Sequence, residues 1–108
     1  MPYCIQFTNH AINDLEGIYD YIYLNDGPGK TDHVINKIES IINKLVEYPN
    51  RGVYPIELKE VGIKDFREVF FKPYRIIYKI LKDTVYVMMI TDGRRDIQSL
   101  LQRRLLIN

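Results

Sequence analysis

The sequence predicts one α+β domain in which a hairpin of two helices packs on a small, twisted antiparallel sheet, in the order β-α-α-β-β-β. Three observations predict this fold. The chain has 108 residues, the usual size of a single domain. Two stretches in its first half carry apolar residues at helical spacing. Three short runs rich in β-branched and aromatic residues follow in its second half. We therefore expect residues 1–108 to form one domain.

The first elements are a strand and a long helix. Tyr3–Thr8 alternates in the way a half-buried strand does. Thr8 or Asn9 can cap the helix that follows. The turn formers at 25–29 end that helix. Its apolar face comprises Ala11, Leu15, Ile18 and Ile22.

A second helix follows, which we expect Thr31 to cap and Pro49 and Gly52 to end. Its apolar stripe comprises Val34, Ile38, Ile41 and Leu45, widened by Ile35 and Ile42. Because the connection between the two helices is short, they should form an antiparallel hairpin. The stretch 53–65 has no clean period and is predicted to be a loop.

Three runs, Phe66–Phe71, Tyr74–Leu81 and Thr84–Ile90, are predicted to form an antiparallel meander, because two-residue gaps separate them. That spacing pairs 70 with 75, 68 with 77, 80 with 85 and 78 with 87. Strand side chains alternate between faces. The face toward the helices should hold Val69, Ile76, Tyr78, Ile80, Val85, Val87 and Met89. The other face should hold Glu68, Phe70, Arg75, Ile77, Lys79, Tyr86, Met88 and Ile90, a mixture that suggests a partner-binding or working surface. A short helix capped by Asp96 can follow over 97–107.

Composition excludes several classes of protein. Apolar residues make up 46% and charged residues 27%, as in globular proteins rather than disordered ones. The longest apolar run, Val85–Ile90, is far shorter than the ~20 residues of a membrane-spanning helix. The first residues lack the basic start and apolar core of a secretory signal, so we expect a cytoplasmic protein without membrane association.

The sequence offers little for a metal or cofactor. It has one cysteine, Cys4, and two histidines, His10 and His33, which are too few for a Cys/His zinc site. Phosphate-binding glycine loops, serine elbows and HExxH motifs are all absent. We therefore predict no metal and no cofactor.

Positive charge gathers in the second half of the chain. Residues 1–65 hold six Lys/Arg and ten Asp/Glu, a net charge of −4, whereas residues 66–108 hold nine and four, a net charge of +5. Arg67, Arg75, Arg94 and Arg95 all lie on or beside the meander. Arginine suits phosphate oxygens, so these residues could serve a nucleic-acid site or an acidic protein partner. Alternatively, Arg75 pairs with Glu68, its diagonal neighbour across the hairpin.

The chain resembles the RelE/ParE superfamily of toxins from bacterial type II toxin–antitoxin modules over nearly its whole length. The strongest matching segment is Pro73-Tyr74-Arg75-Ile76-Ile77-Tyr78. Further matches, in order, are Ala11, Asp14, Leu15, Ile18, Tyr21-Ile22, Pro49, Arg51-Gly52, Glu57-Leu58, Gly62, Phe66-Arg67-Glu68, Val85, Val87 and Asp92-Gly93-Arg94-Arg95-Asp96. The resemblance implies two helices on a twisted antiparallel sheet and a cognate antitoxin as partner.

The resemblance leaves three functions open. RelE-like members cut mRNA on the ribosome, and their basic catalytic residues would correspond to Arg67, Arg75 and Arg95. The C-terminal tyrosine of those nucleases falls where this chain has Leu100-Leu101, so the catalytic set is incomplete. ParE-like members poison DNA gyrase without a nuclease site. The segments from Arg51-Gly52 to Asp96 look more like that branch, which we favour. The third possibility is a non-toxic binding module of the same fold.

The mixed face of the predicted sheet, with the arginines after the last strand, is where we expect such a partner to bind. The antitoxin or the target would bind Glu68, Phe70, Arg75, Ile77, Lys79, Tyr86, Met88, Arg94 and Arg95. The partners would be an antitoxin and either gyrase or the ribosome with its mRNA. Both a homodimer and a heterotetramer with the antitoxin stay open.

Overall fold

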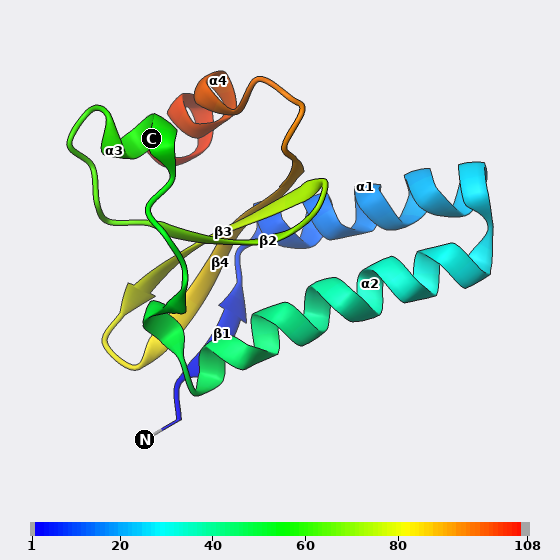
Figure 1. Ribbon diagram of the computed structural model, residues 1–108, viewed down its shortest axis with the longest axis horizontal. Coiled ribbons are helices and arrows are strands. Elements are labelled where there is room, and N and C mark those ends of the chain that lie inside the picture. The colour runs from blue at the N-terminus through cyan, green and yellow to red at the C-terminus, as the bar shows by residue number, and fades with distance from the viewer. Residues whose placement is uncertain (1, 107–108) are drawn as a thin grey trace.

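The computed structural model describes residues 2–106 and arranges them around a four-stranded sheet (Figure 1). Its strands lie in the order β1-β4-β3-β2, where the elements are β1 (Cys4–Phe7), β2 (Arg67–Phe71), β3 (Tyr74–Leu81) and β4 (Thr84–Asp92). The expected antiparallel meander holds for β2, β3 and β4. β1 instead pairs with β4 in parallel, through the crossover that a parallel neighbour requires. The α+β class and the element order are confirmed, and the sheet is mixed.

Two long helices, α1 (Asn9–Asp26) and α2 (Pro28–Asn43), form the expected hairpin, which extends beyond the sheet (Figure 1). Thr8 caps α1, because its hydroxyl accepts from the Ala11 N–H at 3.1 Å. The predicted cap of α2 at Thr31 is wrong. Gly27, with φ of 83°, turns the chain between the helices, and Pro28 takes the first helical position, where a missing N–H costs nothing.

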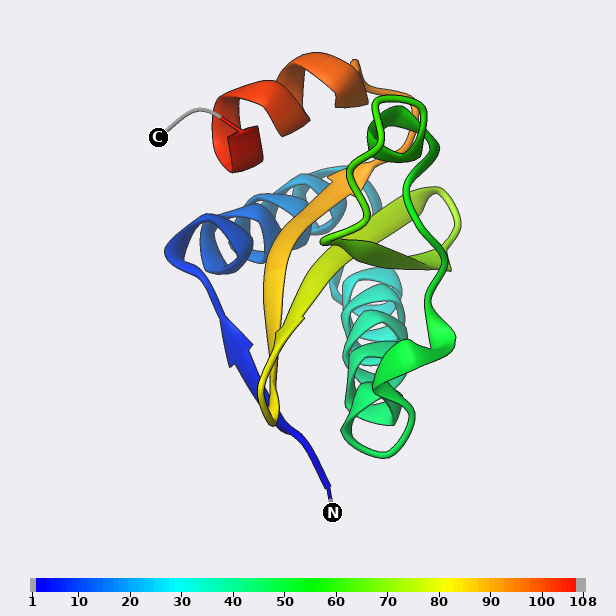
Figure 2. The same ribbon diagram turned by 90° about the vertical axis from the view of Figure 1, so that its left-hand side faces the viewer.

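The stretch predicted as a loop contains a one-turn helix, α3 (Ile56–Lys59), after two 3₁₀ turns, η1 (Lys44–Val46) and η2 (Pro49–Arg51). The C-terminal helix α4 (Ile97–Leu101) runs into a π-helix, η3 (Gln102–Leu106). Asp96 caps α4 as predicted, accepting from the Ser99 N–H at 3.2 Å. α3 and α4 lie together near the end of β4 (Figures 1 and 2). Within residues 2–106, no helix is both long and apolar enough to cross a membrane.

The sheet separates two hydrophobic cores. The first core lies between the sheet and the helical hairpin, and the second lies between the opposite face and α3 with α4. Buried residues of the first core include Ala11, Ile22, Val34, Ile38, Ile42, Leu45, Val69, Ile76, Tyr78, Val85, Val87 and Ile90. Those of the second are Leu58, Phe66, Ile77, Met89, Ile97, Leu100 and Leu101. Both faces of the sheet are therefore at least partly covered by the chain itself.

A β-bulge in β4 changes which side chains face which core. The four predicted pairs are all found, including Phe70 with Arg75 and Ile80 with Val85. Tyr78 pairs with Val87, but Ile77 pairs with Met89, so Met88 is an extra residue in β4. An extra residue reverses the alternation beyond it. Met89 consequently lies in the second core and Ile90 in the first, the opposite of the predicted faces.

Candidate functional site

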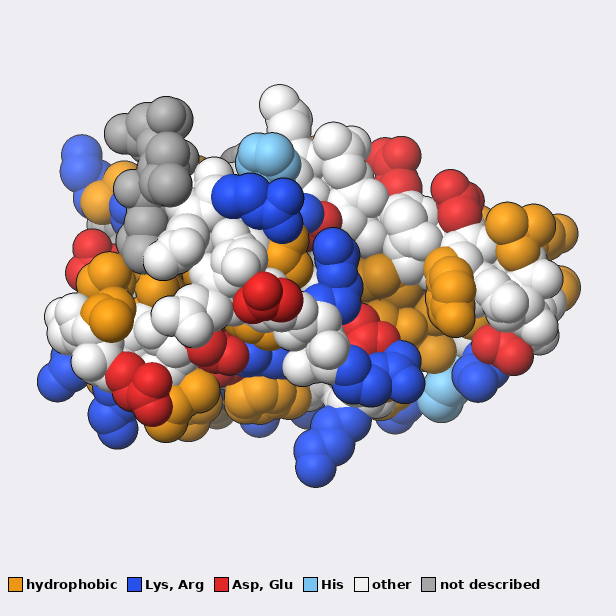
Figure 3. Space-filling model, turned by 90° about the horizontal axis from the view of Figure 1, so that it is seen from above, with side chains coloured by type: hydrophobic (Ala, Val, Ile, Leu, Met, Phe, Trp, Pro, Cys, Tyr) orange, Lys and Arg blue, Asp and Glu red, His pale blue; other side chains and the backbone are white. Residues whose placement is uncertain are grey.

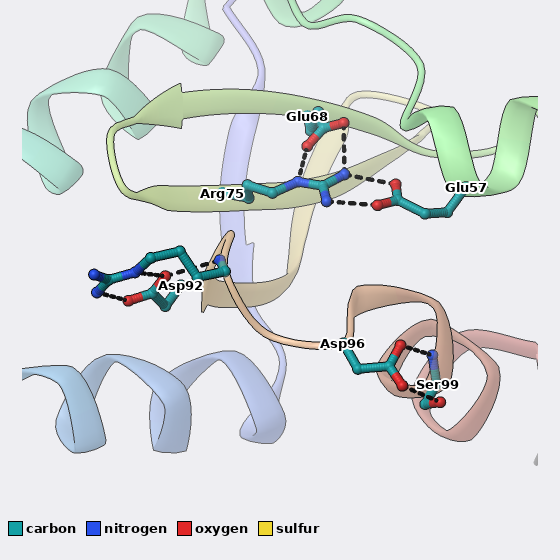
Figure 4. A network of polar contacts seen from close by, with 7 residues as sticks. Glu57, Glu68, Arg75, Asp92, Asp96 and Ser99 are labelled. Carbon is teal, nitrogen blue, oxygen red and sulfur yellow. Dashed lines mark hydrogen bonds and ion pairs between the residues drawn. The ribbon is translucent and has the colours of Figure 1, made fainter.

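Arg75 lies at the centre of a partly buried ion-pair cluster on the α3 side of the sheet. Its Nε and Nη2 donate to Glu68 at 2.7 and 3.0 Å, and its Nη1 and Nη2 donate to Glu57 of α3 at 2.7 and 2.8 Å (Figure 4). Only 13% of the Arg75 side chain and 4% of the Glu68 side chain are exposed. The alternative that paired Arg75 with Glu68 is confirmed, and Glu57 is a second partner that sequence reasoning missed.

The charges of this cluster oppose the binding of a phosphate. One guanidinium faces two carboxylates, so the cluster carries a formal net charge of −1. The hydrogen bond from Arg75 lowers the pKa of Glu57 against the opposing effect of burial. The same two carboxylates raise the pKa of Arg75, chiefly through the Glu57 hydrogen bond. A phosphate would have to displace two carboxylates that already bind the Arg75 guanidinium bidentately.

Arg67 lies on the opposite face of the sheet from Arg75. It pairs across the strands with Tyr78, which belongs to the first core. Its guanidinium donates to the carbonyl oxygens of Asn50 at 3.2 Å and Gly52 at 2.8 Å. It also donates to the Tyr54 hydroxyl and lies 4.7 Å from the centre of that ring. Arg67 therefore holds the segment before α3 against β2. Because side chains alternate between the two faces along paired strands, it lies apart from Arg75.

The two arginines after β4 differ in their partners. Arg94 folds back on Asp92, with Nε 2.9 Å from a carboxylate oxygen, although its side chain is 79% exposed. That hydrogen bond lowers the pKa of Asp92. The Arg95 residue is exposed, and within residues 2–106 its side chain makes no ion pair. Of the residues predicted for a nuclease, Arg67 and Arg75 are half-buried and hydrogen-bonded to other parts of the chain, whereas Arg95 is exposed.

The predicted binding face is only partly open. Ile77 is fully buried in the second core and Ile90 lies in the first, so the expectation that they face a partner is wrong for the folded chain. Glu68 is occupied by Arg75, and Met88 packs against the second core. Phe70 is 48% exposed. The other side chains of this face that are partly exposed are Arg75, Lys79, Tyr86 and Met88.

Other residues of the resemblance also make internal contacts. The Tyr78 hydroxyl donates to the Pro49 carbonyl at 2.6 Å and accepts from the Gly52 N–H at 3.0 Å. A Cβ on Gly52 would lie 2.5 Å from that hydroxyl oxygen, so only glycine fits. Asp14 accepts from Arg104 at 2.6 and 2.8 Å and from the Ile90 N–H at 3.0 Å. Sequence reasoning missed these contacts, because nothing in one sequence pairs residues so far apart.

The proton-transfer groups beside the arginines are already hydrogen-bonded to them: Glu57 and Glu68 to Arg75, Asp92 to Arg94, and the Tyr54 hydroxyl to Arg67. His33 lies edge-on to the Phe71 ring, with 6.4 Å between the ring centroids, and His10 is exposed on α1. Across residues 2–106, no three His, Cys, Asp or Glu side chains come together as ligands for a metal ion.

Solved toxin–antitoxin proteins share this fold. A chain of the chromosomal ParDE system from P. aeruginosa aligns with a TM-score of 0.69 and 18% identity, over 83% of this chain and 95% of that one. A chain of the RelBE2 complex from Mycobacterium tuberculosis aligns with a TM-score of 0.61 and 19% identity, over 85% and 92%. A mutant E. coli toxin RelE in the free state aligns with a TM-score of 0.61 and 14% identity, over 97% of this chain and 100% of that one. This chain thus shares its fold with chains of these ParDE, RelBE2 and RelE structures.

The sequence comparisons give the family within that class. Residues 5–97 match the family model of the ParE toxin of the type II toxin–antitoxin system parDE. Toxin ParE3 of Caulobacter vibrioides is 25% identical over 97 residues, which cover 90% of this chain and 93% of that protein. The chain belongs to the ParE toxin family, and the resemblance stated from the sequence is confirmed.

Proposed function

We propose that this ParE-family protein inhibits growth by binding DNA gyrase, and that a cognate antitoxin neutralises it. The observation that carries the choice of target is the Arg75 cluster, in which Glu57 and Glu68 accept from four N–H groups. A nuclease needs cations that are free to face the phosphate in the transition state. Here the carboxylates of Glu57 and Glu68 already neutralise Arg75. A toxin that acts by binding a protein does not need a free cation at this position.

Membership of the ParE family supports an antitoxin as partner. Two of the similar structures are described as a ParDE system and a RelBE2 toxin–antitoxin complex, so chains of this fold occur with antitoxins. The exposed members of the sheet face are proposed as contacts for the target, with Phe70 as an apolar anchor and Arg94 and Arg95 as charged neighbours.

Induced expression in a bacterium tests the target. We expect a DNA-damage reporter to switch on and cells to filament while protein synthesis continues. The purified protein should inhibit supercoiling by gyrase in vitro. An immediate stop of protein synthesis with cleaved mRNA, and unaffected gyrase, would instead support a RelE-like endonuclease.

Coexpression tests the antitoxin. The probe is the product of a small open reading frame adjoining the gene, with a DNA-binding N-terminus and an amphipathic tail. We expect it to restore growth and to copurify with the toxin. Normal growth on induction of the folded protein alone would contradict the proposal and support a non-toxic binding module.

A further inference from the structure

A basic pocket, which we call the edge pocket, lies at the end of the sheet where β2 begins and β3 ends. This end is on the left in Figure 1 and faces the viewer in Figure 2. The pocket has a volume of about 310 Å³. Its lining consists of Tyr54, Lys64, Asp65, Arg67, Lys79 and Ile80. Three cations and one carboxylate give this lining a formal net charge of +2.

Aromatic rings hold the three cations of the edge pocket in place. The Lys64 Nζ lies 5.9 Å from the centre of the Tyr54 ring, and the Arg67 Cζ lies 4.7 Å from the same centre. The Lys79 Nζ lies 5.9 Å from the centre of the Phe66 ring. An aromatic ring attracts a cation through its quadrupole but carries no net charge. These contacts therefore orient the cations without neutralising them.

The cations of the edge pocket keep their charge. Among residues 2–106, no carboxylate lies within ion-pair distance of Lys64, Arg67 or Lys79. The acceptors of Arg67 are two carbonyl oxygens and a hydroxyl, all of them uncharged. From above, by contrast, Lys and Arg side chains lie among Asp and Glu side chains near the middle of the molecule (Figure 3). The edge pocket is thus a place where unpaired positive charge converges, and an external anion can supply the missing partner.

The geometry of the edge pocket selects a phosphate of a nucleic-acid duplex. Its cations come from the loop before β2, from β2 and from β3, so one compact anion can contact all three more easily than a row of carboxylates along a peptide can. Lysine and arginine are the usual partners of backbone phosphates. Phe66 is only 6% exposed, and two cations already lie over the Tyr54 ring. Neither ring is free to stack on an unpaired base, which disfavours a single strand.

We propose that the edge pocket binds a backbone phosphate of duplex DNA, so that the toxin contacts DNA as well as gyrase. The inference deepens the proposed function, and its second half rests on that function, because duplex DNA is the substrate of gyrase. Lys79 belongs both to the edge pocket and to the sheet face that is proposed to contact the target. DNA bound in the pocket therefore adjoins a protein bound at that face.

Binding of a labelled duplex to the full-length protein tests the pocket. The probe is a fluorescein-labelled DNA duplex of about 20 base pairs and arbitrary sequence, followed by fluorescence anisotropy at about 50 mM salt. We expect a Kd of about 10⁻⁴ M or tighter, as in sequence-independent binding. One strand of the same probe should bind at least about threefold more weakly, because its charge density is lower and its bases find no free ring.

Removal of two lysines makes the test specific to the pocket. Lys64→Gln combined with Lys79→Gln should weaken duplex binding at least about fivefold and reduce the salt slope of log Kd by about one, the share of one phosphate. Lys64→Gln alone, at an exposed position, should weaken binding at least about threefold. The control is Lys37→Gln combined with Lys44→Gln, which removes the same charge from exposed positions outside the pocket. That control should change the affinity less than about twofold. Thermal melting verifies that each variant is folded.

Three results would overturn the edge-pocket proposal. The first is no binding of the duplex up to about 1 mM protein. The second is equal weakening of duplex binding by the pocket variants and by the control. The third is tighter binding of the single strand, or of a labelled polyglutamate peptide, than of the duplex, which would point to a different partner.

Inhibition of gyrase separates this inference from the proposed function. A parent protein that inhibits supercoiling but does not bind duplex DNA through the pocket would overturn the inference alone. A parent protein that binds duplex DNA through the pocket but leaves gyrase active and cells growing would reject the proposed function and keep the pocket.

Discussion

Replacing Arg75 with methionine should destabilise the fold strongly. Methionine keeps an unbranched stem of similar length but removes the four hydrogen bonds to Glu57 and Glu68. Both carboxylates accept from the same Nη2, so they would be left close together without a cation. Breaking a buried ion pair by removing one partner costs roughly 3–5 kcal/mol.

The exposure of the two carboxylates determines where in that range the cost of Arg75→Met falls. Glu68 is 4% exposed in its side chain and cannot reach water without moving β2. Glu57 is 21% exposed and lies on a one-turn helix, so it can turn toward solvent. We therefore expect a loss of about 3 kcal/mol in the free energy of unfolding, at the lower end of the range.

Urea unfolding of the purified protein measures this loss, with Arg94→Met as the matched control. Arg94 also makes an arginine–carboxylate pair, with Asp92, but its side chain is 79% exposed. Such surface pairs contribute little to stability, so Arg94→Met should unfold at nearly the same urea concentration as the parent. The triple variant Glu57→Gln, Glu68→Gln and Arg75→Met should recover part of the loss, because it leaves no uncompensated buried charge.

The pH dependence of the stability difference between the parent and Arg75→Met provides a second measurement. Arg75 lowers the pKa of Glu57 in the folded protein from its ordinary value of 4.5. A depressed carboxyl pKa contributes stability that is fully present above the unfolded value and is lost as the pH falls through the folded value. The methionine variant lacks that contribution. The gap between parent and variant should therefore be largest near neutral pH and shrink as the pH falls below 4.5.

A folded Arg75→Met variant whose stability lies within about 1 kcal/mol of the parent would refute this reasoning. If that variant had also lost toxicity, Arg75 would be a contact for the target rather than part of the scaffold. A lysine distinguishes the two roles further. It keeps the charge but cannot form the fork that bridges Glu57 and Glu68, so Arg75→Lys should also be destabilised.

Three further changes test the scaffold. Gly52→Ala should cost about 1–3 kcal/mol in thermal melting, because its Cβ would lie 2.5 Å from the Tyr78 oxygen. Gly29→Ala, where the Cβ meets nothing within 4 Å, should not destabilise α2 and serves as its control. Ile38→Ala should cost ~2–5 kcal/mol of unfolding free energy, since Ile38 is fully buried, and a loss below ~1 kcal/mol would contradict the assigned helix face. Asp14→Asn should weaken the contact with Arg104 and speed hydrogen exchange in 97–106, whereas unchanged exchange would mean that the pair does not hold η3.

The sequence predicted most of the sheet because its signals there are local. Two-residue gaps and alternating side chains set the pairing of β2 with β3 and of β3 with the first part of β4. The bulge at Met88 could not be predicted, because Val85–Ile90 is an uninterrupted apolar run with no glycine to mark an irregularity. α3 was missed for a related reason. A single turn is unstable alone and depends here on Leu58 in the second core and on the Glu57 pair.

The same distinction applies to the candidate site. The pairing of Arg75 with Glu68 follows from the register of one hairpin, so the sequence could raise it as an alternative. The contact with Glu57 joins two elements with no regular spacing between them, and only the folded chain shows it. The alternation of side chains along paired strands already places Arg67 and Arg75 on opposite faces of the sheet. The prediction that both belong to one catalytic site did not take this into account.

The residues that identify the family are mostly those that build its fold. In the segment Pro73–Tyr78, Arg75 is bound to Glu57 and Glu68, and the Tyr78 hydroxyl is bound to Pro49 and Gly52. Such side chains have few donors left for a target, so matching them establishes the scaffold, and the closed Arg75 cluster argues only against a phosphate-binding role. Contact with the target must then depend on exposed residues such as Arg95 and Phe70. Substitutions there should change toxicity at little cost in stability, the reverse of what we expect at Arg75.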